Sequence, residues 1–384
     1  MKLRLANFTV HLRKLNLFCF KNIEEAQLEF QNDIICLLGK NGSGKTSLLD
    51  AIHYLSFTRS AINTSDAQNV KIGLNQFMIK GQFEMGMPDS QERMRTKEVM
   101  CSFQTGQKKI IREDGQDCIK FSEHIGRFPV VLIAPQDIEL IWDGGEVRRK
   151  FFDTLLSQLD KSYLENLIVY TNHLKQRNSL LRTFSETGVV DHDLLASYDQ
   201  KLIPAGQVIS KKRAAWVNEF LPHLQEQYLF LIDGANEEVK VEYNSDLQTS
   251  SFADLLAKNL SKDIALQRTT TGVHRDDFEF QINGRELKKF GSQGQQKSFL
   301  IALKLAEFHA IAHAKSIKPL LLLDDIFDKL DDYRIHQLMR LISQGTFGQI
   351  FITDAREGRS LEIIKAAHVN AQVFTVQNGT FTNG

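Results

Sequence analysis

The stretch Gly39-Lys40-Asn41-Gly42-Ser43-Gly44-Lys45-Thr46 indicates the fold of this chain of 384 residues. It matches the pattern G-x-x-x-x-G-K-[ST] and lies between an apolar run, Ile34–Leu38, that predicts a buried strand and a segment that predicts a helix. Glycines let backbone N–H groups turn inward around phosphate oxygens, and the helix N-terminus adds a favourable dipole. The sequence therefore predicts a phosphate-binding loop for ATP, in which Lys45 contacts the β- and γ-phosphates and the Thr46 hydroxyl binds Mg²⁺.

The composition is that of an ordinary globular protein. Lys and Arg number 47, Asp and Glu also number 47, and hydrophobic residues make up 42%. These figures exclude intrinsic disorder, collagen and small disulfide scaffolds. The zero net charge argues against a basic coat over the whole surface, but it allows a local basic face that binds nucleic acid.

The cysteines and the hydropathy pattern exclude several further classes. Cys19, Cys36, Cys101 and Cys118 form no C-x-x-C pair, so their spacing predicts neither a zinc site nor a redox motif. The sequence contains neither a signal-peptide pattern nor about 18 consecutive apolar residues. We therefore expect a cytoplasmic protein without a membrane partner.

The pattern of elements changes twice along the chain. Residues up to about 144 read as α/β, with short strands between residues 70 and 121. The next stretch is mostly helical with a β-like interruption near 238–243, and α/β character returns after residue 270, including a long helix near 295–314. The simplest organisation is one α/β nucleotide-binding domain, residues 1–144 and 266–384, split by a mainly helical insertion, residues 145–265. That insertion is a candidate DNA-binding or partner-binding lobe.

Two adjacent carboxylates follow a second apolar strand. Leu320–Leu323 predicts a buried strand, and Asp324 and Asp325 come directly after it. In a P-loop ATPase one such carboxylate binds Mg²⁺ and the other polarises the attacking water. We assign the metal to Asp324 and the water to Asp325, because neighbouring side chains of a strand point to opposite faces.

Small and amide side chains open the long helix before that strand. Ser292, Gly294 and Gln295 could form an anion site at a helix N-terminus, although this stretch by itself favours an ordinary helix cap with Ser292 as the capping residue. In this order along the chain, the stretch resembles the signature motif of the ATP-binding-cassette (ABC) family. That family sets its signature serine and glycine against the γ-phosphate held by the other subunit.

The combination of motifs resembles the RecF family, bacterial recombination-repair ATPases related to the heads of SMC-type chromosome proteins. The matching pieces span nearly the whole chain: LNLFCFKNI (15–23), the P-loop, DAIHYLSFTRS (50–60), APQDIELIWDGGEVRRKFFD (134–153), YTNHLKQRNSLL (170–181), TGVHRDD (271–277), SQGQQKS (292–298) and LLLDDIFDKLDDYR (321–334). The resemblance implies an ABC-type P-loop ATPase head with a helical insertion as its second lobe.

The resemblance also implies roles for further residues. Gln136 fits the Q-loop, which senses nucleotide and metal, and Asp331 fits the D-loop, which crosses the dimer interface. The plain alternatives are a loop amide for Gln136 and a helix cap for Asp331. Thr353 and Asp354 occupy the position of the ABC switch residue without the histidine that is common there, and His274 reads as structural.

Three departures from the family's usual pattern are visible. Lys297 stands where arginine is expected, FCFKN replaces an Asn-Phe-Arg-Asn run, and residues 1–10 precede the usual start. The lysine keeps the charge but loses the bidentate fork of arginine.

The candidate site comprises three overlapping sets. The catalytic residues are Lys45, Asp324, Asp325 and Gln136. The metal ligands are Thr46, Asp324 and Gln136. The cofactor-binding residues are Gly39, Lys40, Asn41, Gly42, Ser43, Gly44, Lys45, Thr46, Ser47, Ser292, Gly294, Gln295 and Asp331.

Basic residues cluster in or near the predicted insertion. They are Arg148, Arg149, Lys150, Lys175, Arg177, Lys211, Lys212 and Arg213. Composition alone favours a solvated helix surface. The resemblance favours a face that contacts DNA phosphates without reading bases.

The expected function is an ATP-dependent DNA-binding protein of recombinational repair. It would dimerise on ATP, be released by slow hydrolysis, and help load recombinase at single-strand gaps with RecR and RecO as partners. The alternatives are an SMC-like head and a transporter ATPase subunit. An insertion of about 120 residues without a C-x-x-C hook is too short for long coiled-coil arms, and the motifs TGVHRDD and QRNSLL argue against a transporter.

Overall fold

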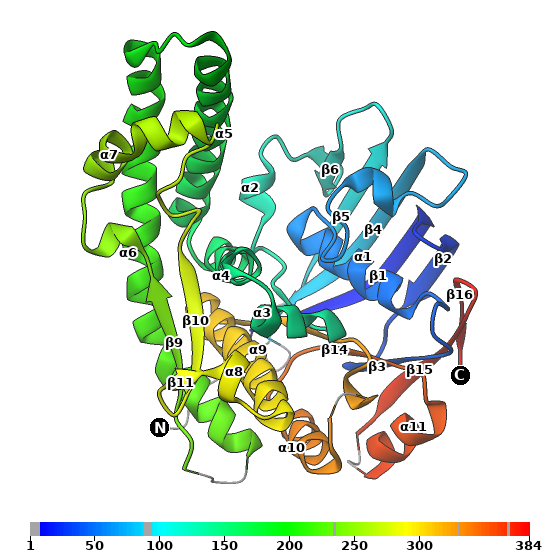
Figure 1. The fold of residues 1–384 in the computed structure, drawn as a ribbon. Helices are drawn as coiled ribbons and strands as arrows, with labels where there is room; N and C mark the ends of the chain where they lie inside the picture. The colour runs from blue at the N-terminus through cyan, green and yellow to red at the C-terminus, as the bar shows by residue number, and fades with distance from the viewer. Residues whose placement is uncertain (1–7, 88–93, 233–235, 329, 367–368) are drawn as a thin grey trace. The chain divides into compact units, whose positions relative to one another are not determined.

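The structure is a computed structural model that describes residues 8–87, 94–232, 236–328, 330–366 and 369–384. The chain divides into two compact units (Figure 1). Unit 1 comprises residues 1–137, 230–234 and 297–384, and unit 2 comprises residues 138–229 and 235–296. The predicted boundary at residue 265 differs from this division, because the strand Asp277–Ile282 pairs with Val239–Asn244 and so belongs to unit 2. Of the proposed N-terminal extension, residues 1–7 lie outside the described residues.

A six-stranded sheet carries the P-loop in unit 1. Its strand order is β16-β15-β3-β14-β13-β8, and all neighbours are parallel except β16, which is antiparallel to β15. The strands are β3 (Ile34–Leu38), β8 (Val130–Ile133), β13 (Leu320–Leu323), β14 (Ile350–Asp354), β15 (Ala371–Gln377) and β16 (Thr380–Asn383). Every residue of β3, β13 and β14 is buried, which explains the continuous apolar sequence of β3 and β13 and the apolar start of β14 before Thr353 and Asp354.

A second, seven-stranded sheet completes unit 1. Its order is β12-β1-β4-β5-β6-β7, with β2 paired to β1. The strands are β1 (Phe8–Phe20), β2 (Ile23–Glu29), β4 (Gln76–Gly86), β5 (Arg95–Gln104), β6 (Ile110–Glu113), β7 (Gln116–Asp117) and β12 (Ile317–Lys318). The prediction of short strands after residue 70 was wrong for β4 and β5, which pair over ten residues each.

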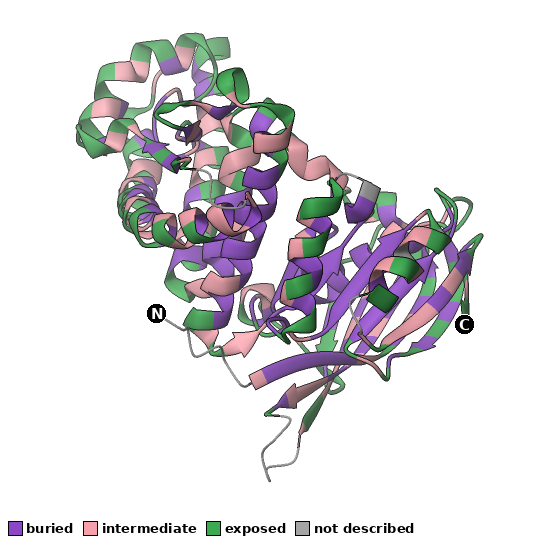
Figure 2. Cartoon of the chain, turned by 90° about the horizontal axis from the view of Figure 1, so that it is seen from below, coloured by how far each residue is buried: buried purple, intermediate pink, exposed green. Residues whose placement is uncertain are grey.

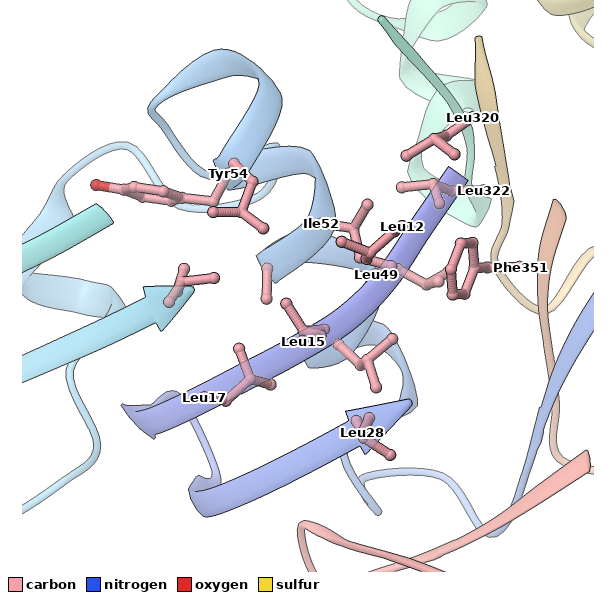
Figure 3. Packing of buried hydrophobic residues seen from close by; sticks show 14 of the residues in the cluster. Leu12, Leu15, Leu17, Leu28, Leu49, Ile52, Tyr54, Leu320, Leu322 and Phe351 are labelled. Atoms are coloured by element: carbon pink, nitrogen blue, oxygen red, sulfur yellow. The ribbon is translucent and has the colours of Figure 1, made fainter. Parts of the chain in front are cut away.

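The P-loop helix α1 (Lys45–Phe57) contacts both sheets. Leu49 and Ile52 share one core cluster with Leu15 of β1, Leu322 of β13 and Phe351 of β14 (Figure 3). Most residues of α1 are buried, and they include Asp50, whose charge is paired with Lys21 at 2.6 Å. The start of α1, where the P-loop ends, is therefore fixed by packing against both sheets.

The remaining elements of unit 1 are short helices, together with the long helix α9. They are η1 (Asp66–Asn69), α2 (Phe121–His124), η2 (Pro135–Ile138), α9 (Gln293–Lys315), η4 (Ile326–Asp328), α10 (Asp332–Ser343) and α11 (Glu357–Ala366). The first residues of α9 belong to unit 2 and the rest to unit 1. Figure 2 shows buried residues along the sheet strands and exposed residues over the outer helices.

Unit 2 is mainly helical around one small antiparallel sheet, β11-β10-β9. Its elements are α3 (Glu139–Trp142), α4 (Gly145–Leu159), α5 (Lys161–Thr187), α6 (His192–Leu231), β9 (Val239–Asn244), η3 (Asp246–Gln248), α7 (Phe252–Ala265), β10 (Asp277–Ile282), β11 (Arg285–Glu286) and α8 (Leu287–Phe290). Tyr163, Tyr170 and Phe252 belong to its core. Within the described ranges, no helix is long and apolar enough to cross a membrane.

Candidate functional site

The predicted P-loop connects β3 to α1 and folds around its own lysine. Lys45 is only 4% exposed, and its Nζ donates to the carbonyl oxygens of Gly39 at 2.6 Å and Lys40 at 3.1 Å. The Ser43 hydroxyl is buried and has no hydrogen-bond partner within the described part of the chain. A buried ammonium and an unsatisfied hydroxyl in one loop fit the oxygens of a phosphate group.

Two glycines are required by the geometry of this loop. A Cβ at Gly39 would lie 2.2 Å from the carbonyl oxygen of Val376 in β15. Gly44 has φ 119° at the N-cap of α1, a conformation that side chains disfavour. The glycines of the motif thus permit a close backbone approach at one end of the loop and a left-handed turn at the other.

Sequence reasoning missed Asn22, which fixes the loop from outside. Its Nδ2 donates to the Gly42 carbonyl at 3.0 Å, and its Oδ1 accepts from the Ser47 hydroxyl at 2.7 Å. The N–H of Gly379, from the β15–β16 turn, donates to the Ser43 carbonyl at 2.7 Å. Asn22 lies in the stretch LNLFCFKNI that carries part of the family resemblance, and this was the available signal.

The structure brings Thr46 and Asp324 together across 278 residues of sequence. The Thr46 hydroxyl lies 3.0 Å from each carboxylate oxygen of Asp324. Thr353, at the predicted switch position in β14, donates its hydroxyl to Asp324 Oδ1 at 2.7 Å and accepts from the Asp325 N–H at 2.9 Å. The two strands are parallel neighbours, so their carboxyl ends meet beside the start of α1.

Strand alternation does not set the directions of the Asp324 and Asp325 side chains. The strand β13 ends at Leu323, before both residues, so the argument from alternating side chains was wrong. Asp325 has φ 45°, in the left-handed region. Aspartate tolerates this conformation better than most residues do, and such strain commonly marks functional positions.

Burial dominates the electrostatics of Asp324. The residue is 4% exposed, and burial raises the pKa of its carboxyl group, while the hydroxyls of Thr353 and Thr46 act in the opposite direction. A hydroxyl and a carboxylate at this distance are the oxygen ligands that Mg²⁺ prefers. The donor set therefore fits the predicted cation.

Gln136 follows the neighbouring strand β8 in the turn η2. The Asp324 N–H donates to the Ile133 carbonyl at the end of β8, which places the two chain segments side by side. Among the described residues, no hydrogen bond joins Gln136 to Thr46 or Asp324. The turn itself is fixed by Asp137, which accepts from the Ala134 N–H at 2.7 Å and lies 3.4 Å from the buried Nζ of Lys304.

The predicted signature residues form a capping box at the start of α9. The Ser292 hydroxyl accepts from the Gln295 N–H at 3.2 Å, and Gln295 Oε1 accepts from the Ser292 N–H at 2.8 Å. Gln295 Nε2 also donates to Glu237 at 2.8 Å. The Gln295 amide is thus occupied within unit 2, whereas the Ser292 side chain is exposed.

Asp331 is the N-cap of α10. Its carboxylate accepts from the Arg334 N–H at 2.9 Å and pairs with the Arg334 guanidinium. Arg334 Nε donates in turn to the Ser298 hydroxyl of α9 at 2.6 Å. The exposed Asp331 is therefore joined to the last residue of the SQGQQKS stretch through one arginine.

Two of the predicted DNA-contacting residues are buried, so the prediction was wrong for Arg177 and Arg213. Arg177 is 0% exposed and pairs with Asp199 and Asp263. Arg213 is 1% exposed and pairs with Asp153 and Asp276. A buried guanidinium requires such carboxylate partners and cannot reach a DNA backbone.

The other basic residues divide by exposure. Arg148 and Arg149 are half-buried and contact residues 276–277, and Lys212 pairs with Asp160. The exposed members of the predicted set are Lys150, Lys175 and Lys211, one on each of α4, α5 and α6.

The family-specific stretches TGVHRDD and QRNSLL form the polar interior of unit 2. Asp276 and Asp277 bind Arg213 and Arg148 respectively. Asn178 Oδ1 accepts from the N–H and the hydroxyl of Thr269 at 2.8 and 2.7 Å. These stretches therefore contribute to the packing of unit 2.

His274 of TGVHRDD is a structural residue, as the sequence predicted. Its Nδ1 lies 2.7 Å from the Tyr170 hydroxyl and its Nε2 lies 3.0 Å from the Thr269 carbonyl. Burial lowers its pKa to about 4, so the ring is neutral at physiological pH.

Comparison with known proteins relates the whole chain to one family. The family described as "RecF/RecN/SMC N terminal domain" matches residues 11–382. The "DNA replication and repair protein RecF" of Flavobacterium johnsoniae is 42% identical over 367 residues, which cover 96% of this chain and 100% of that protein. The protein of the same description from Cytophaga hutchinsonii is 40% identical, over 96% of each.

Solved structures agree with these relatives. A structure of "the recombination mediator protein RecF-ATP in RecFOR pathway" aligns with a TM-score of 0.85 at 28% identity and covers 100% of both chains. The corresponding RecF-ATPrS structure gives a TM-score of 0.84 at 29% identity, over 97% of this chain and 98% of that one. An Smc head from Pyrococcus furiosus shares the fold, with a TM-score of 0.55 at 14% identity, over 98% of this chain and 96% of that one.

The buried carboxyl group of Asp324 generates a prediction about pH. Because the pKa of Asp324 is raised in the folded state, its ionised carboxylate lowers the free energy of unfolding at pH values above that pKa. This destabilisation disappears as the carboxyl group becomes protonated at lower pH. Without nucleotide or cation, Asp324→Asn should melt at the same temperature as the parent or higher at neutral pH. The difference should shrink as the pH falls through the raised pKa.

Melting curves of both proteins between pH 5 and 8 measure this difference. Added Mg²⁺ and ATP should stabilise the parent and leave the variant unchanged. A variant that melts well below the parent at neutral pH would contradict the role of desolvation.

Proposed function

The chain belongs to the RecF family of DNA replication and repair proteins, and from this membership we propose that it is an ATPase of recombinational repair that binds DNA as an ATP-dependent dimer. The observation that carries the ATPase assignment is the contact between Thr46 and Asp324. It joins the P-loop helix to the carboxylate strand in the arrangement that nucleotide hydrolysis requires.

Binding of ATP requires Lys45 to exchange partners. In this structure its Nζ donates hydrogen bonds to the carbonyl oxygens of Gly39 and Lys40. It would donate to the β- and γ-phosphates instead when they enter the loop. Thr46, Asp324 and Gln136 are the candidates for holding Mg²⁺, which when bound would neutralise phosphate charge. Ser43 and the backbone N–H groups of the loop would donate to the remaining phosphate oxygens.

Asp325 is the candidate for orienting the attacking water. The Thr353 hydroxyl accepts from the Asp325 backbone N–H and donates to the Asp324 carboxylate, so one side chain holds the backbone of Asp325 and the carboxylate of Asp324. In this way Asp324 can stay with the metal while Asp325 serves the nucleophile.

A second subunit would complete each site. Ser292 is exposed at the N-terminus of α9, where the helix dipole favours an anion. We place this terminus, with Gly294 and Asp331, against the γ-phosphate held by the partner. Hydrolysis would remove the shared phosphate and release the dimer from DNA, so slow turnover would set the residence time.

DNA binding would use the exposed lysines of unit 2. Lys150, Lys175 and Lys211 carry charge without buried carboxylate partners of the kind that hold Arg177 and Arg213. Lysines on helices contact phosphates and read no bases, so binding should depend on DNA form and salt. RecR and RecO are the partners that the family suggests at single-strand gaps.

The alternatives are less well supported. An SMC-like head shares the fold at only 14% identity, whereas RecF relatives reach about 40% over nearly the whole chain. A transporter subunit would not need the RecF-specific stretches that build unit 2.

Asp325→Asn and Lys45→Ala should fail at different steps. Asp325→Asn should bind ATP normally, hydrolyse it at least about 100-fold more slowly and accumulate as a dimer, because only the water-orienting group is lost. Lys45→Ala should bind ATP about 10- to 100-fold more weakly, since a charge-assisted contact disappears. Calorimetric titration and phosphate release measure the two steps, and parental turnover by Asp325→Asn would remove Asp325 from catalysis.

Ser292→Arg tests the shared site. The arginine should leave ATP binding by the monomer intact and abolish ATP-driven dimerisation and hydrolysis together, because the bulky side chain blocks closure. Mixing this variant with Lys45→Ala restores one site that combines an intact P-loop with an intact α9 terminus. Partial recovery of ATPase activity on mixing is expected. Unchanged dimerisation of Ser292→Arg in light scattering would show that Ser292 is only a helix cap.

Arg213→Ala and Lys211→Ala distinguish a buried residue that stabilises the fold from an exposed residue that we propose contacts DNA. Arg213→Ala should cost about 3–5 kcal/mol of stability, because it leaves the buried Asp276 and the half-buried Asp153 without their guanidinium partner. Lys211→Ala should change stability by no more than about 0.5 kcal/mol and lower the salt slope of DNA binding by about 1. Urea unfolding and binding titrations at several salt concentrations measure both, and an unchanged salt slope would exclude Lys211 from the DNA contact.

A further inference from the structure

Three metal-ligating side chains meet away from the nucleotide site. They are Glu113 at the end of β6, Cys118 just after β7 and His124 at the end of α2. One ligand atom from each lies within 4.8 Å of the other two. Their spacing matches no common zinc motif, so nothing in the sequence pattern groups them.

The hydrogen bonds of His124 leave one ring nitrogen ready to bind a cation. The ring is 1% exposed, and Nε2 lies 2.6 Å from the Leu55 carbonyl, which can only accept. Nε2 must therefore carry the proton, so Nδ1 presents a lone pair. Nδ1 is buried without a hydrogen-bond partner in the described part of the chain. A carbonyl that fixes the tautomer is the usual support of a metal-binding histidine.

The other two side chains supply anionic ligands. Glu113 is 9% exposed, and Oε2 accepts from Arg127 at 2.6 Å, which leaves a second carboxylate oxygen. Cys118 is half-buried, and its N–H donates to the Ile111 carbonyl, which fixes its backbone beside β6. Burial and then the charge of Glu113 raise the pKa of the Cys118 thiol. A bound cation would reverse this and release the thiol proton to solvent.

We propose that Glu113, Cys118 and His124 form a Zn²⁺ site with three protein ligands and a fourth position for water. Thiolate, imidazole and carboxylate together favour Zn²⁺ over Mg²⁺ or Ca²⁺, which prefer oxygen ligands. Ligand atoms around tetrahedral Zn²⁺ are roughly 3.5 Å apart, so the side chains need to close by about 1 Å. Arg127 would remain on Glu113 as its outer partner.

The competing explanation is that His124 only caps the helix α1. The Leu55 carbonyl is one of the last four of α1, which lack partners within the helix. That role requires Nε2–H and gives no reason for a buried Nδ1 without a hydrogen-bond partner in the described part of the chain, on a ring that lies beside a thiol and a carboxylate. The metal would add a link from β6 and β7 through α2 to the P-loop helix.

Zinc titration of the purified full chain, stripped with a chelator, tests the site. We expect one Zn²⁺ per chain, a rise in melting temperature on binding, and a thiolate-to-cobalt charge-transfer band when Co²⁺ replaces Zn²⁺. Cys118→Ser, Glu113→Gln and His124→Gln should each weaken Zn²⁺ at least about tenfold. The glutamine at 124 keeps an amide N–H for the Leu55 carbonyl, so helix capping survives.

Cys19→Ser, which removes another buried thiol, is the matched control and should bind Zn²⁺ like the parent. Circular dichroism before titration shows whether each variant is folded, and the cobalt band of the parent reports thiolate ligation independently of any variant. Absence of stoichiometric zinc, absence of the band, or parental affinity in folded Cys118→Ser would each overturn the proposal.

Discussion

The hydrogen bond between the Thr46 hydroxyl and the Asp324 carboxylate is the contact on which the site depends. It requires the first turn of α1 to meet the end of β13, although the two residues are 278 positions apart. Packing of α1 against both sheets of unit 1 enforces that meeting. Thr353 of β14 then couples the two residues, because its hydroxyl donates to the Asp324 carboxylate and accepts from the Asp325 backbone N–H.

Unit 2 is organised by buried charge. Arg177 and Arg213 each bind two carboxylates. Asp276 and Asp277 of the TGVHRDD stretch pair with Arg213 on α6 and with Arg148 on α4. Buried ion pairs of this kind add little net stability, but breaking one is costly, so they favour one arrangement of the helices. The stretches TGVHRDD and QRNSLL therefore stabilise the arrangement of unit 2. The residues proposed for ATP hydrolysis come instead from the P-loop and the carboxylate motif, which resemble those of other ABC-type heads.

The sequence predicted the local part of this protein well. The P-loop, the strand before Asp324 and Asp325, and the helix that begins after Ser292 all follow from short stretches whose periodicity and glycine placement are sufficient. The ordered motifs also gave the family, which the comparisons confirm over nearly the whole chain. Charge runs were less informative, because Arg213 and the neighbouring Lys211 look equivalent in sequence and differ completely in burial.

Sequence alone thus determined which residues form the phosphate loop and the carboxylate strand, because those features depend on neighbours within a few positions. Only the tertiary structure decided which residues far apart in the sequence come into contact. Asn22 reaches the P-loop, Thr353 joins the Asp324 carboxylate to the Asp325 backbone N–H, and Glu113, Cys118 and His124 converge near Leu55. These contacts depend on how the strands pair and how α1 is buried. Burial also decides whether a charged side chain binds a partner inside the protein or remains available at its surface.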